Sequence, residues 1–303
     1  MYGNSLFHIA AGAVVPEQLT HYVRAVSGRT PLAAGDYVAY RHDRHAVLVA
    51  YPQDAAPESK AGGEAKRETE QGPPAGGGLW APVSLDAALA SLRDSCDSVT
   101  VLAPFRPAEA PASVASGSAD AYWQILLPAA PPGQKLRNML RRAGRELTVR
   151  AETWHDEHAD LVGRYLASRP LPPGTRSIFA ALAAYAGGND ANVVLLAARR
   201  SDASLAAFLI GDFTSLHTAF YMFAFRSPDA PPGASDLLVG HLLREAEERG
   251  HSRVNLGLGI NGGIAFFKKK WGAVPFAPYA ETTWEFTAKN ASVLASLRSL
   301  FSR

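Results

Sequence analysis

Residues 191–226 read ANVVLLAARRSDASLAAFLIGDFTSLHTAFYMFAFR, and the rest of the chain can be placed around them. The stretch holds three runs of mostly aliphatic and aromatic residues, joined by links of five and three residues: 191–198, 204–212 and 216–226. Runs of this length and composition are typical of strands. Links this short allow neighbouring strands to pair only antiparallel. The stretch therefore predicts an antiparallel meander of three strands.

Helices and strands alternate in the segments after the meander. Asp236–Arg249 has the apolar periodicity of a helix, with Ser235 as its expected N-cap and Gly250 as its expected C-cap. The other elements expected here are a strand at Val254–Leu256, a helix from Asn261 to Trp271, strands at Val274–Phe276 and Thr282–Phe286, and a terminal helix.

An amphipathic helix is expected upstream of the meander, from Gln134 onward. Its apolar residues recur at the spacing of one helix face: Leu136, Met139, Leu140 and Ala143. Arg137, Arg141 and Arg145 form a stripe on another face. The elements expected between this helix and the meander are a strand at Leu147–Thr153 and helices at Asp156–Ser168 and Ser177–Gly187.

The first 130 residues predict a smaller arrangement of strands and helices. The expected elements are a helix at Pro16–Ser27, a hairpin of strands at Asp36–Arg41 and His45–Tyr51, a helix at Leu85–Arg93, and strands at Ser98–Pro104 and Ala121–Leu127. Residues 53–78 interrupt them and are dense in Gly, Pro, Ala and charged residues, without a large apolar side chain. Such a composition predicts a mobile loop.

The composition excludes several classes of protein. Of 303 residues, 47% are hydrophobic and 19% charged, which excludes disorder for most of the chain. Apolar runs fall far short of the roughly 18–20 residues of a membrane helix, and the first residues lack the basic start of a signal peptide. Cys96 is the single cysteine, and no Cys/His cluster has zinc spacing. We therefore expect a cytoplasmic protein without a membrane span or a metal site.

The net charge of +2 does not suggest DNA binding, but two basic clusters stand out. One is Lys268–Lys270. The other is Lys135, Arg137, Arg141, Arg142, Arg145 and Arg150, opposed only by Glu146. Arginine clusters suit phosphate because the guanidinium group binds it in a bidentate manner. A solvated helix surface is the alternative interpretation of both.

The order of helices and strands around the meander resembles the GNAT superfamily of N-acyltransferases. In that family a turn and helix start like Arg226–Ser235 bind the pyrophosphate of the donor, through free N–H groups and the positive helix end. A second segment is similar to the family's Asn-led short helix, with Asn261, Ala265, Phe267, Lys270 and Gly272 in register. Lys268 stands where the family usually has Tyr.

Phe267–Gly272 and the basic run Lys135–Val149 are similar to the Fem-type subgroup, which includes aminoacyltransferases of peptidoglycan bridges. This resemblance implies an α/β (α+β) fold of tandem GNAT-like units, with a mixed, largely antiparallel twisted sheet flanked by helices. The N-terminal unit, residues 1–130 with the loop 53–78, would be degenerate. Residues 131–303 would form the N-acyltransferase domain.

The resemblance and the residue chemistry together give three groups of candidate site residues: catalytic residues, which comprise Lys268 and the candidates for proton transfer, donor-binding residues and substrate-binding residues. Lys268 would stabilise the oxyanion or a donor phosphate, or protonate a leaving group if its pKa were lowered. Candidates for proton transfer are Asp212, His217 and Tyr221, although turn or core positions would also explain them. The expected donor-binding residues are Arg226, Gly233, Ala234, Ser235, Asn261 and Lys270. The expected substrate-binding residues are Arg137, Arg141, Tyr165, Arg169 and Asn255.

Three functions remain open at this point. The first is transfer of an acyl group from a thioester, acyl-CoA or acyl carrier protein, to a primary amine by direct attack. The second is Fem-type transfer from aminoacyl-tRNA to a cell-wall precursor, lipid or peptide, with salt-sensitive RNA binding. The third is a non-catalytic GNAT-fold binding protein. No permanently bound cofactor is expected, since the acyl donor is a cosubstrate. The oligomeric state is not indicated.

Overall fold

The computed structural model of the chain describes residues 2–54, 85–105, 120–188 and 190–286. Its helices are α1 (Tyr2–Ala11), the 3-10 helix η1 (Pro16–Gln18), α2 (Thr20–Ser27), α3 (Asp86–Arg93), α4 (Gln134–Glu146), α5 (Asp156–Ala167), α6 (Pro173–Ala180), α7 (Leu182–Ala186), α8 (Ala234–Glu248) and α9 (Gly262–Lys270). Its strands are β1 (Thr30–Ala34), β2 (Tyr37–His42), β3 (His45–Val49), β4 (Ser98–Ala103), β5 (Asp120–Leu126), β6 (Thr148–Glu152), β7 (Val193–Arg199), β8 (Leu205–Asp212), β9 (Thr218–Arg226), β10 (Arg253–Leu258) and β11 (Val274–Glu285).

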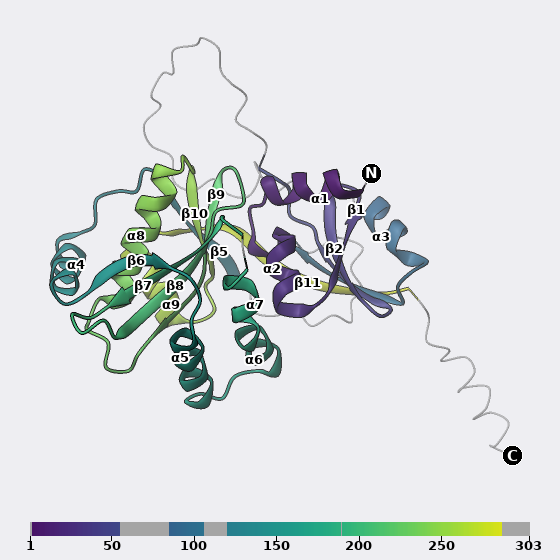
Figure 1. Cartoon of the computed structure of the whole chain (residues 1–303). Helices are drawn as coiled ribbons and strands as arrows, with labels where there is room; N and C mark the ends of the chain where they lie inside the picture. Colours follow the sequence, from purple (N-terminus) through teal and green to yellow (C-terminus); the bar gives the residue numbers. More distant parts are fainter. Residues whose placement is uncertain (1, 55–84, 106–119, 189, 287–303) are drawn as a thin grey trace, which may run out of the picture.

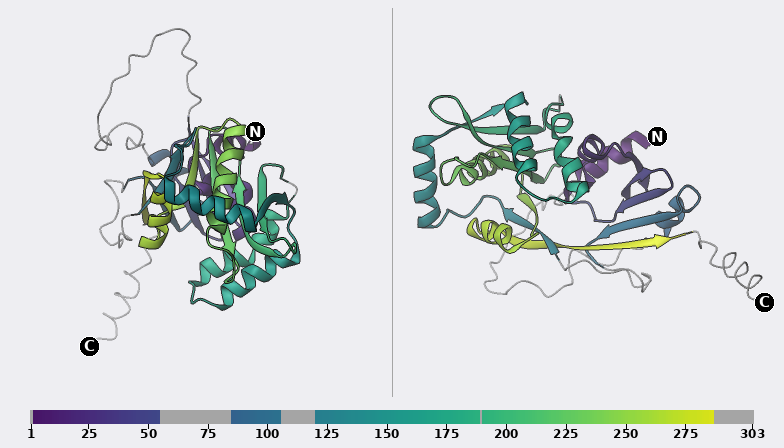
Figure 2. Two further views of the ribbon diagram at one scale, coloured as in Figure 1. Left: turned by 90° about the vertical axis from the view of Figure 1, so that its left-hand side faces the viewer. Right: turned by 90° about the horizontal axis from the view of Figure 1, so that it is seen from below.

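The described strands form one sheet in the order β1-β2-β3-β4-β11-β5-β10-β9-β8-β7-β6. Among these pairings only β3–β4 and β9–β10 are parallel. Helices cover both faces, as Figures 1 and 2 show. This mixed, mostly antiparallel sheet flanked by helices confirms the fold class that the sequence predicts.

The strands of the meander are continuous apolar runs because their alternating side chains are buried on both faces of the sheet. In β7, Leu196 and Ala198 pack in the cluster that includes α8, whereas Leu195 and Ala197 pack in the cluster on the other face, with α5, α6 and α7. A strand buried on both faces needs apolar side chains at every position. The pairing of β7 with β8 and of β8 with β9 is antiparallel, so the predicted meander is confirmed.

Strand β11 joins the two halves of the sheet. Ala280–Glu285 pair with β4, and Val274–Tyr279 pair with β5. The right-hand view of Figure 2 shows β11 running from α9 into the N-terminal half. The sequence analysis was wrong to expect two separate strands here, because Pro275 and Pro278 lie inside one strand that tolerates them at an irregular register with β5.

Several other elements differ from the prediction. Helix α1 and strand β1 were not foreseen, Ser177–Gly187 contributes to two short helices, α6 and α7, and Pro16–Ser27 divides into η1 and α2. The division falls at Leu19, whose extended backbone (φ −81°, ψ 98°) interrupts the helix. The predicted terminal helix and residues 55–78 of the predicted loop lie outside the described residues. The division into units 1–130 and 131–303 stays a prediction.

In the described parts of the chain, no helix combines the length and the apolar character needed to cross a bilayer.

Candidate active site

A gap between β9 and β10 creates the site. The two strands pair only where Arg253–Asn255 lie beside Thr218–Phe220. Beyond that point β9 continues to Arg226 and β10 to Leu258 without pairing to each other. The register of β10 with β5 shifts between Asn255 and Leu258, and Gly257 has φ +77°, so β10 bends away from β9. One edge of β9 is therefore open to a ligand.

Asn255 holds this bend and is unavailable to a substrate. Its side chain is fully buried, donates to the carbonyl oxygen of Val14 at 2.8 Å and accepts from the N–H of Gly257 at 2.7 Å. The expectation that Asn255 contacts substrate is therefore wrong. Both polar ends of the amide are occupied by backbone.

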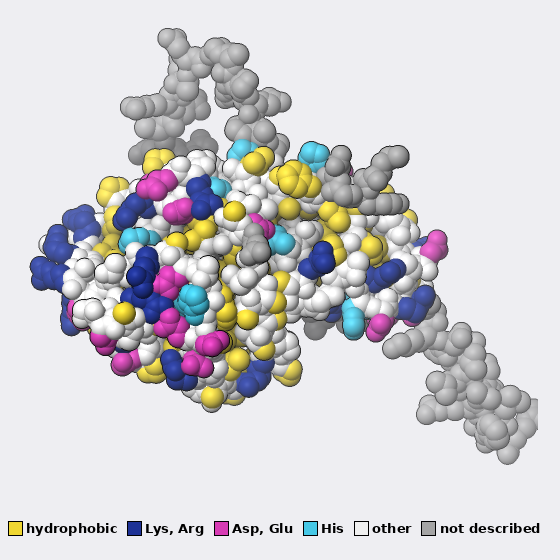
Figure 3. All heavy atoms as spheres, in the orientation of Figure 1, with side chains coloured by type: hydrophobic (Ala, Val, Ile, Leu, Met, Phe, Trp, Pro, Cys, Tyr) yellow, Lys and Arg dark blue, Asp and Glu magenta, His cyan; other side chains and the backbone are white. Residues whose placement is uncertain are grey.

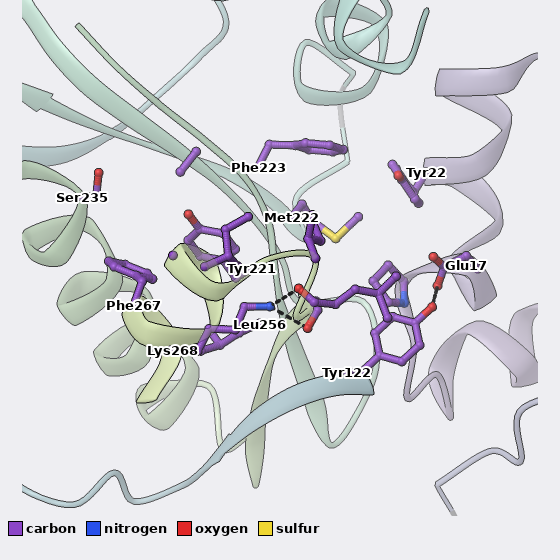
Figure 4. A pocket seen from close by; sticks show the side chains of 17 residues that line it. Glu17, Tyr22, Tyr122, Tyr221, Met222, Phe223, Ser235, Leu256, Phe267 and Lys268 are labelled. Atoms are coloured by element: carbon purple, nitrogen blue, oxygen red, sulfur yellow. Dashed lines mark hydrogen bonds between the residues drawn. The ribbon is translucent and has the colours of Figure 1, made fainter. Parts of the chain in front are cut away.

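A mostly apolar cavity of about 470 Å³ lies in this gap; we call it cavity 1. Its walls come from both halves of the chain, as Figure 4 shows. The lining residues are Pro16, Glu17, Tyr22, Tyr122, Tyr221, Met222, Phe223, Ala224, Ser235, Leu256, Gly257, Leu258, Ile260, Gly263, Ile264, Phe267 and Lys268. A pocket of this size, mostly apolar with a few polar groups, suits a small ligand.

Lys268 is the cation of cavity 1. It is 3% exposed, and its Nζ donates to the carbonyl oxygens of Gly257 at 2.7 Å and Leu258 at 2.5 Å. Burial lowers the pKa of the ammonium group to about 8, although Asp120 acts against this shift. An ammonium group has three N–H donors, so one remains for a ligand in the cavity. The bend in β10 supplies the two carbonyl groups that hold Lys268.

Glu17 is the carboxylate of cavity 1 and was missed by the sequence analysis. It lies in η1, and its Oε2 accepts a hydrogen bond of 2.8 Å from the hydroxyl of Tyr122. Burial raises the pKa of Glu17, although the hydrogen bond from Tyr122 opposes the rise. Figure 4 shows Glu17 and Lys268 on opposite sides of the cavity, with Tyr122 next to Glu17.

A second cavity of about 480 Å³, cavity 2, shares Tyr221, Ala224 and Ser235 with cavity 1. Its other lining residues are Leu161, Arg164, Tyr165, Ser168, Arg169, Phe225, Arg226, Ser227 and Pro228. Tyr221 therefore stands where the two cavities meet. Burial and the nearby Asp236 raise the pKa of the Tyr221 phenol, which keeps it protonated and able to donate a hydrogen bond.

Three arginines give cavity 2 its charge. Arg164 and Arg169 come from the end of α5 and the segment after it, and Arg226 from the end of β9. Within the described part of the chain, none of the three forms an ion pair; Arg169 lies over the ring of Tyr165 at 4.7 Å. No carboxylate lines the cavity. The arrangement can bind a phosphate group.

The structure thus brings together five predicted residues around cavity 2 and its junction with cavity 1: Tyr165, Arg169, Tyr221, Arg226 and Ser235. Lys268 joins Tyr221 and Ser235 at cavity 1. Ser235 lies at the start of α8, where a helix was predicted to begin, but Gly233 is the N-cap rather than Ser235. Gly233 has φ +91°, and a Cβ there would lie 2.7 Å from Met139 of α4, so glycine allows α4 to pack closely; Ala234 is buried.

Other predicted residues lie away from both cavities. Asp212 is fully buried and accepts hydrogen bonds of 2.6 Å each from His21 and Tyr185, so it cannot serve as an exposed base. The Nε2 atom of His217 is also buried and lines neither cavity. Asp212 was wrongly predicted as a base, because His21 and Tyr185 enclose it, and His217 lies away from both cavities.

Two predicted donor-binding residues have structural partners instead. Lys270 forms an ion pair of 2.6 Å with Asp236 of α8. Asn261 caps α9, accepting from the N–H of Ile264 at 3.0 Å. Arg137 and Arg141 are exposed on α4, outside the cavities.

A group that could be mistaken for a metal site lies elsewhere. Glu152, Glu157 and His158 place their ligand atoms within 4.8 Å of one another. However, Arg199 binds both carboxylates, at 2.6 Å to each oxygen of Glu152 and also to Glu157. The pKa of Glu152 falls to about 2 because of these hydrogen bonds. The guanidinium group already supplies the positive charge that a metal would bring.

A comparison with known protein families shows to which family the chain belongs. A family model described as "Phosphatidylglycerol lysyltransferase, C-terminal" matches residues 131–302, more than half of the chain. The chain belongs to this family. As a member of the phosphatidylglycerol lysyltransferase C-terminal family, it has the GNAT-like fold that the sequence predicts. No curated protein matches its sequence significantly.

Solved structures share the fold over almost the whole length. L-PGS from Bacillus licheniformis is 12% identical with a TM-score of 0.53, covering 95% of this chain and 98% of that one. The C-terminal domain of a putative lysylphosphatidylglycerol synthetase from Agrobacterium fabrum is 14% identical with a TM-score of 0.54, covering 98% and 96%. FemX is 9% identical with a TM-score of 0.54, covering 92% and 94%. At these identities the likeness shows the fold alone.

Proposed function

We propose that the protein is a Fem-type aminoacyltransferase, which moves an aminoacyl group from aminoacyl-tRNA to a phosphate-bearing acceptor. The observation that carries the proposal is that cavity 1 has a carboxylate, Glu17, and a cation, Lys268, on opposite sides. An aminoacyl ester has an α-ammonium group beside its carbonyl group. A partly buried carboxylate suits the ammonium, and the free N–H of Lys268 suits the oxyanion that forms at the carbonyl. A plain acyl thioester would leave Glu17 without a counterpart.

The reaction needs one bond to form and one to break. The acceptor's hydroxyl or amine group attacks the carbonyl carbon of the aminoacyl ester, and the bond from that carbon to the ribose oxygen breaks. The acceptor's proton ends on the ribose oxygen, so the overall charge is unchanged. Tyr221, protonated at the junction of the cavities, would hydrogen-bond a reacting oxygen. The enzyme's contribution is positioning and charge stabilisation, without a covalent intermediate or a bound cofactor.

We assign the acceptor's phosphate to cavity 2. Its three arginines, without a carboxylate among the lining residues, fit a phosphodiester. The family's description names phosphatidylglycerol, whose headgroup carries a phosphodiester and a free hydroxyl. A lipid of this kind is therefore the acceptor we propose, and a tRNA donor would place the reaction on the cytoplasmic side. The N-terminal half would contribute to catalysis through Glu17.

The donor RNA would bind along α4. Its exposed basic residues are Lys135, Arg137, Arg141, Arg142 and Arg145, and Figure 3 shows Lys and Arg gathered at this edge of the molecule. Helix α4 packs against Gly233 at the start of α8, and the neighbouring Ser235 lines both cavities. An RNA backbone on α4 would therefore lie near the site.

Charge reversal on α4 tests the RNA surface. We expect Arg137→Glu combined with Arg141→Glu to weaken tRNA binding by about tenfold or more near 0.1 M salt, because phosphate contacts dominate such affinities. The slope of log affinity against log salt should become shallower by about 2. Fluorescence anisotropy with labelled tRNA across a salt series measures both. Arg24→Glu, exposed on α2, is the control; equal losses in both variants would contradict the assignment.

The function itself is tested with radiolabelled donors. Purified protein is mixed with a set of aminoacyl-tRNAs and vesicles containing phosphatidylglycerol, and in parallel with acetyl-CoA or long-chain acyl-CoA and amine acceptors. We expect label to move from aminoacyl-tRNA to the lipid and no transfer from the thioesters. Transfer from a thioester alone would instead support the N-acyltransferase reading. Binding of all donors without transfer would support a non-catalytic protein.

A further inference from the structure

A third cavity of about 210 Å³, which we call cavity 3, lies against the N-terminal half and adjoins the site. Glu17 and Tyr22 line both this cavity and cavity 1. The remaining walls are mostly aliphatic: Val23, Val26, Val47, Val49, Leu102 and Ile178. They come from α2, β3, β4 and α6, so both halves of the chain build the cavity.

Two of the polar groups that line cavity 3 are already hydrogen-bonded within the protein. The hydroxyl of Tyr40 donates to the carbonyl oxygen of Glu17 at 2.8 Å, and that of Ser27 donates to Val23 at 2.6 Å. Arg29 is the one cation among the lining residues, and its Nη1 is buried without a hydrogen-bond partner within the described chain. A second cation placed here would be repelled by the charge of Arg29.

We propose that cavity 3 receives the side chain of the transferred aminoacyl group and that this side chain is apolar rather than cationic. The inference rests on the proposed function, in which Glu17 binds the α-ammonium group. The α-carbon carries both the ammonium group and the side chain. The first atom of the side chain is therefore two bonds from the ammonium nitrogen, so a donor whose ammonium group lies against Glu17 has its side chain close to the wall that the two cavities share.

The size of the cavity agrees with one amino-acid side chain. An apolar protein cavity of about 150 Å³ is large enough to bind benzene, so about 210 Å³ accommodates a leucine, isoleucine or methionine side chain. Burying such a side chain among the valines is favourable in proportion to the apolar area removed from water. A lysyl side chain would instead lose hydration of its ammonium group and lie near Arg29. Although the family's description names lysyl transfer, these residues favour a different aminoacyl group.

Binding of amino-acid amides tests the cavity without requiring transfer. L-leucine amide, L-lysine amide and L-alanine amide are titrated into the full chain by calorimetry. We expect leucine amide to bind about tenfold or more tightly than alanine amide, as one to three buried methylene groups allow, and lysine amide to bind more weakly than leucine amide. Lysine amide binding as tightly as leucine amide would overturn the proposal.

Two variants test the position of the side chain. Val47→Phe, at a half-buried position of β3, should weaken leucine amide by about tenfold and change alanine amide by less than about threefold. Arg29→Glu should shift the preference toward lysine amide by about tenfold, whereas Arg24→Glu, which lines none of the three cavities, should not. Both comparisons are ratios measured on one folded preparation, so a loss of folding cannot imitate them. Unchanged ratios in both variants would overturn the proposal.

A further experiment distinguishes failure of this inference from failure of the proposed function. Leucyl-, isoleucyl-, methionyl- and lysyl-tRNA are compared as donors with phosphatidylglycerol vesicles. Preferred transfer from one of the apolar donors supports both ideas. The expected amide preferences without transfer from any tRNA would support the cavity and contradict the function. Transfer from lysyl-tRNA alone would support the function and contradict the cavity.

Discussion

Glu17→Gln is expected to lower kcat/KM for aminoacyl transfer by about 100-fold, mainly through a higher KM. Removing one partner of a desolvated charged pair costs about 2–5 kcal/mol, and each 1.4 kcal/mol is a factor of ten. The amide keeps the shape of the side chain and can still accept from Tyr122, as the carboxylate does at 2.8 Å. The loss therefore reports the missing negative charge.

Stability should respond in a different direction from activity. Burial raises the pKa of Glu17, so the folded state binds a proton more tightly than the unfolded state, and the ionised carboxylate costs stability at neutral pH. Glu17→Gln should therefore unfold at the same or a higher temperature than wild type. The wild-type transfer rate should fall as the pH drops through the raised pKa, since only the anion binds ammonium.

Steady-state kinetics and thermal denaturation of three proteins check these statements. Glu248→Gln, exposed on α8, is the matched control and should retain wild-type kinetics. Wild-type kcat/KM in Glu17→Gln would show that the carboxylate takes no part. A lower melting temperature together with lost activity would point to a structural role for Glu17.

Lys268→Met is expected to reduce kcat by about 100-fold or more. Removal of one oxyanion-stabilising donor in other enzymes costs about 2.7–4 kcal/mol, and here the two hydrogen bonds that hold the carbonyl groups of Gly257 and Leu258 are lost as well. Lys269→Met changes the exposed neighbour and should leave kcat within about twofold. Equal effects of the two substitutions would contradict the role of Lys268.

The pH dependence distinguishes the charge of Lys268 from its packing. Its pKa of about 8 lies below the ordinary 10.5, so the cation and the rate that depends on it are lost as the pH rises through about 8. Between about 8 and 10.5 the unfolded chain binds more protons than the folded chain, so the stability of the fold rises with pH over that interval. Transfer and stability should thus change in opposite directions.

Lys268→Arg isolates this effect from titration of the substrate's own amine. Arginine stays charged, so if the variant is active its rate should fall at a higher pH than that of wild type. Lys269→Met should keep the wild-type profile. A wild-type rate that is constant from pH 7 to about 9.5 would contradict the assignment.

Local patterns in the sequence predicted much of the GNAT-like half. The apolar runs of the meander and the spacing of Leu136, Met139 and Ala143 depend on neighbours in the chain, and these elements are confirmed. The same patterns placed Tyr165, Arg169 and Arg226 at the ends of elements. Those ends converge on cavity 2 because β9 loses its β10 partner there.

Side chains whose roles depend on distant contacts could not be predicted in the same way. Glu17 meets Tyr122 across 105 positions, and a single acidic residue in a short turn gives no periodic signal. Asp212 looked like an exposed turn residue, but His21 lies 191 positions away and closes over it. Asn255 and Lys270 looked free to bind a ligand, although a backbone carbonyl and Asp236 already hold them. A role inferred from the type of a residue alone does not take into account the partners that the residue has within the folded protein.

The shared strand β11 has a consequence for how the chain acquires its structure during synthesis. Residues 274–285 leave the ribosome after all the other described strands, yet they pair with both β4 and β5. Until then the facing edges of β4 and β5 lack this partner, and open strand edges invite pairing with other chains. The nascent chain therefore has two partly built sheets that a single late segment must unite, and a translation product that stops before residue 274 would expose both edges to aggregation.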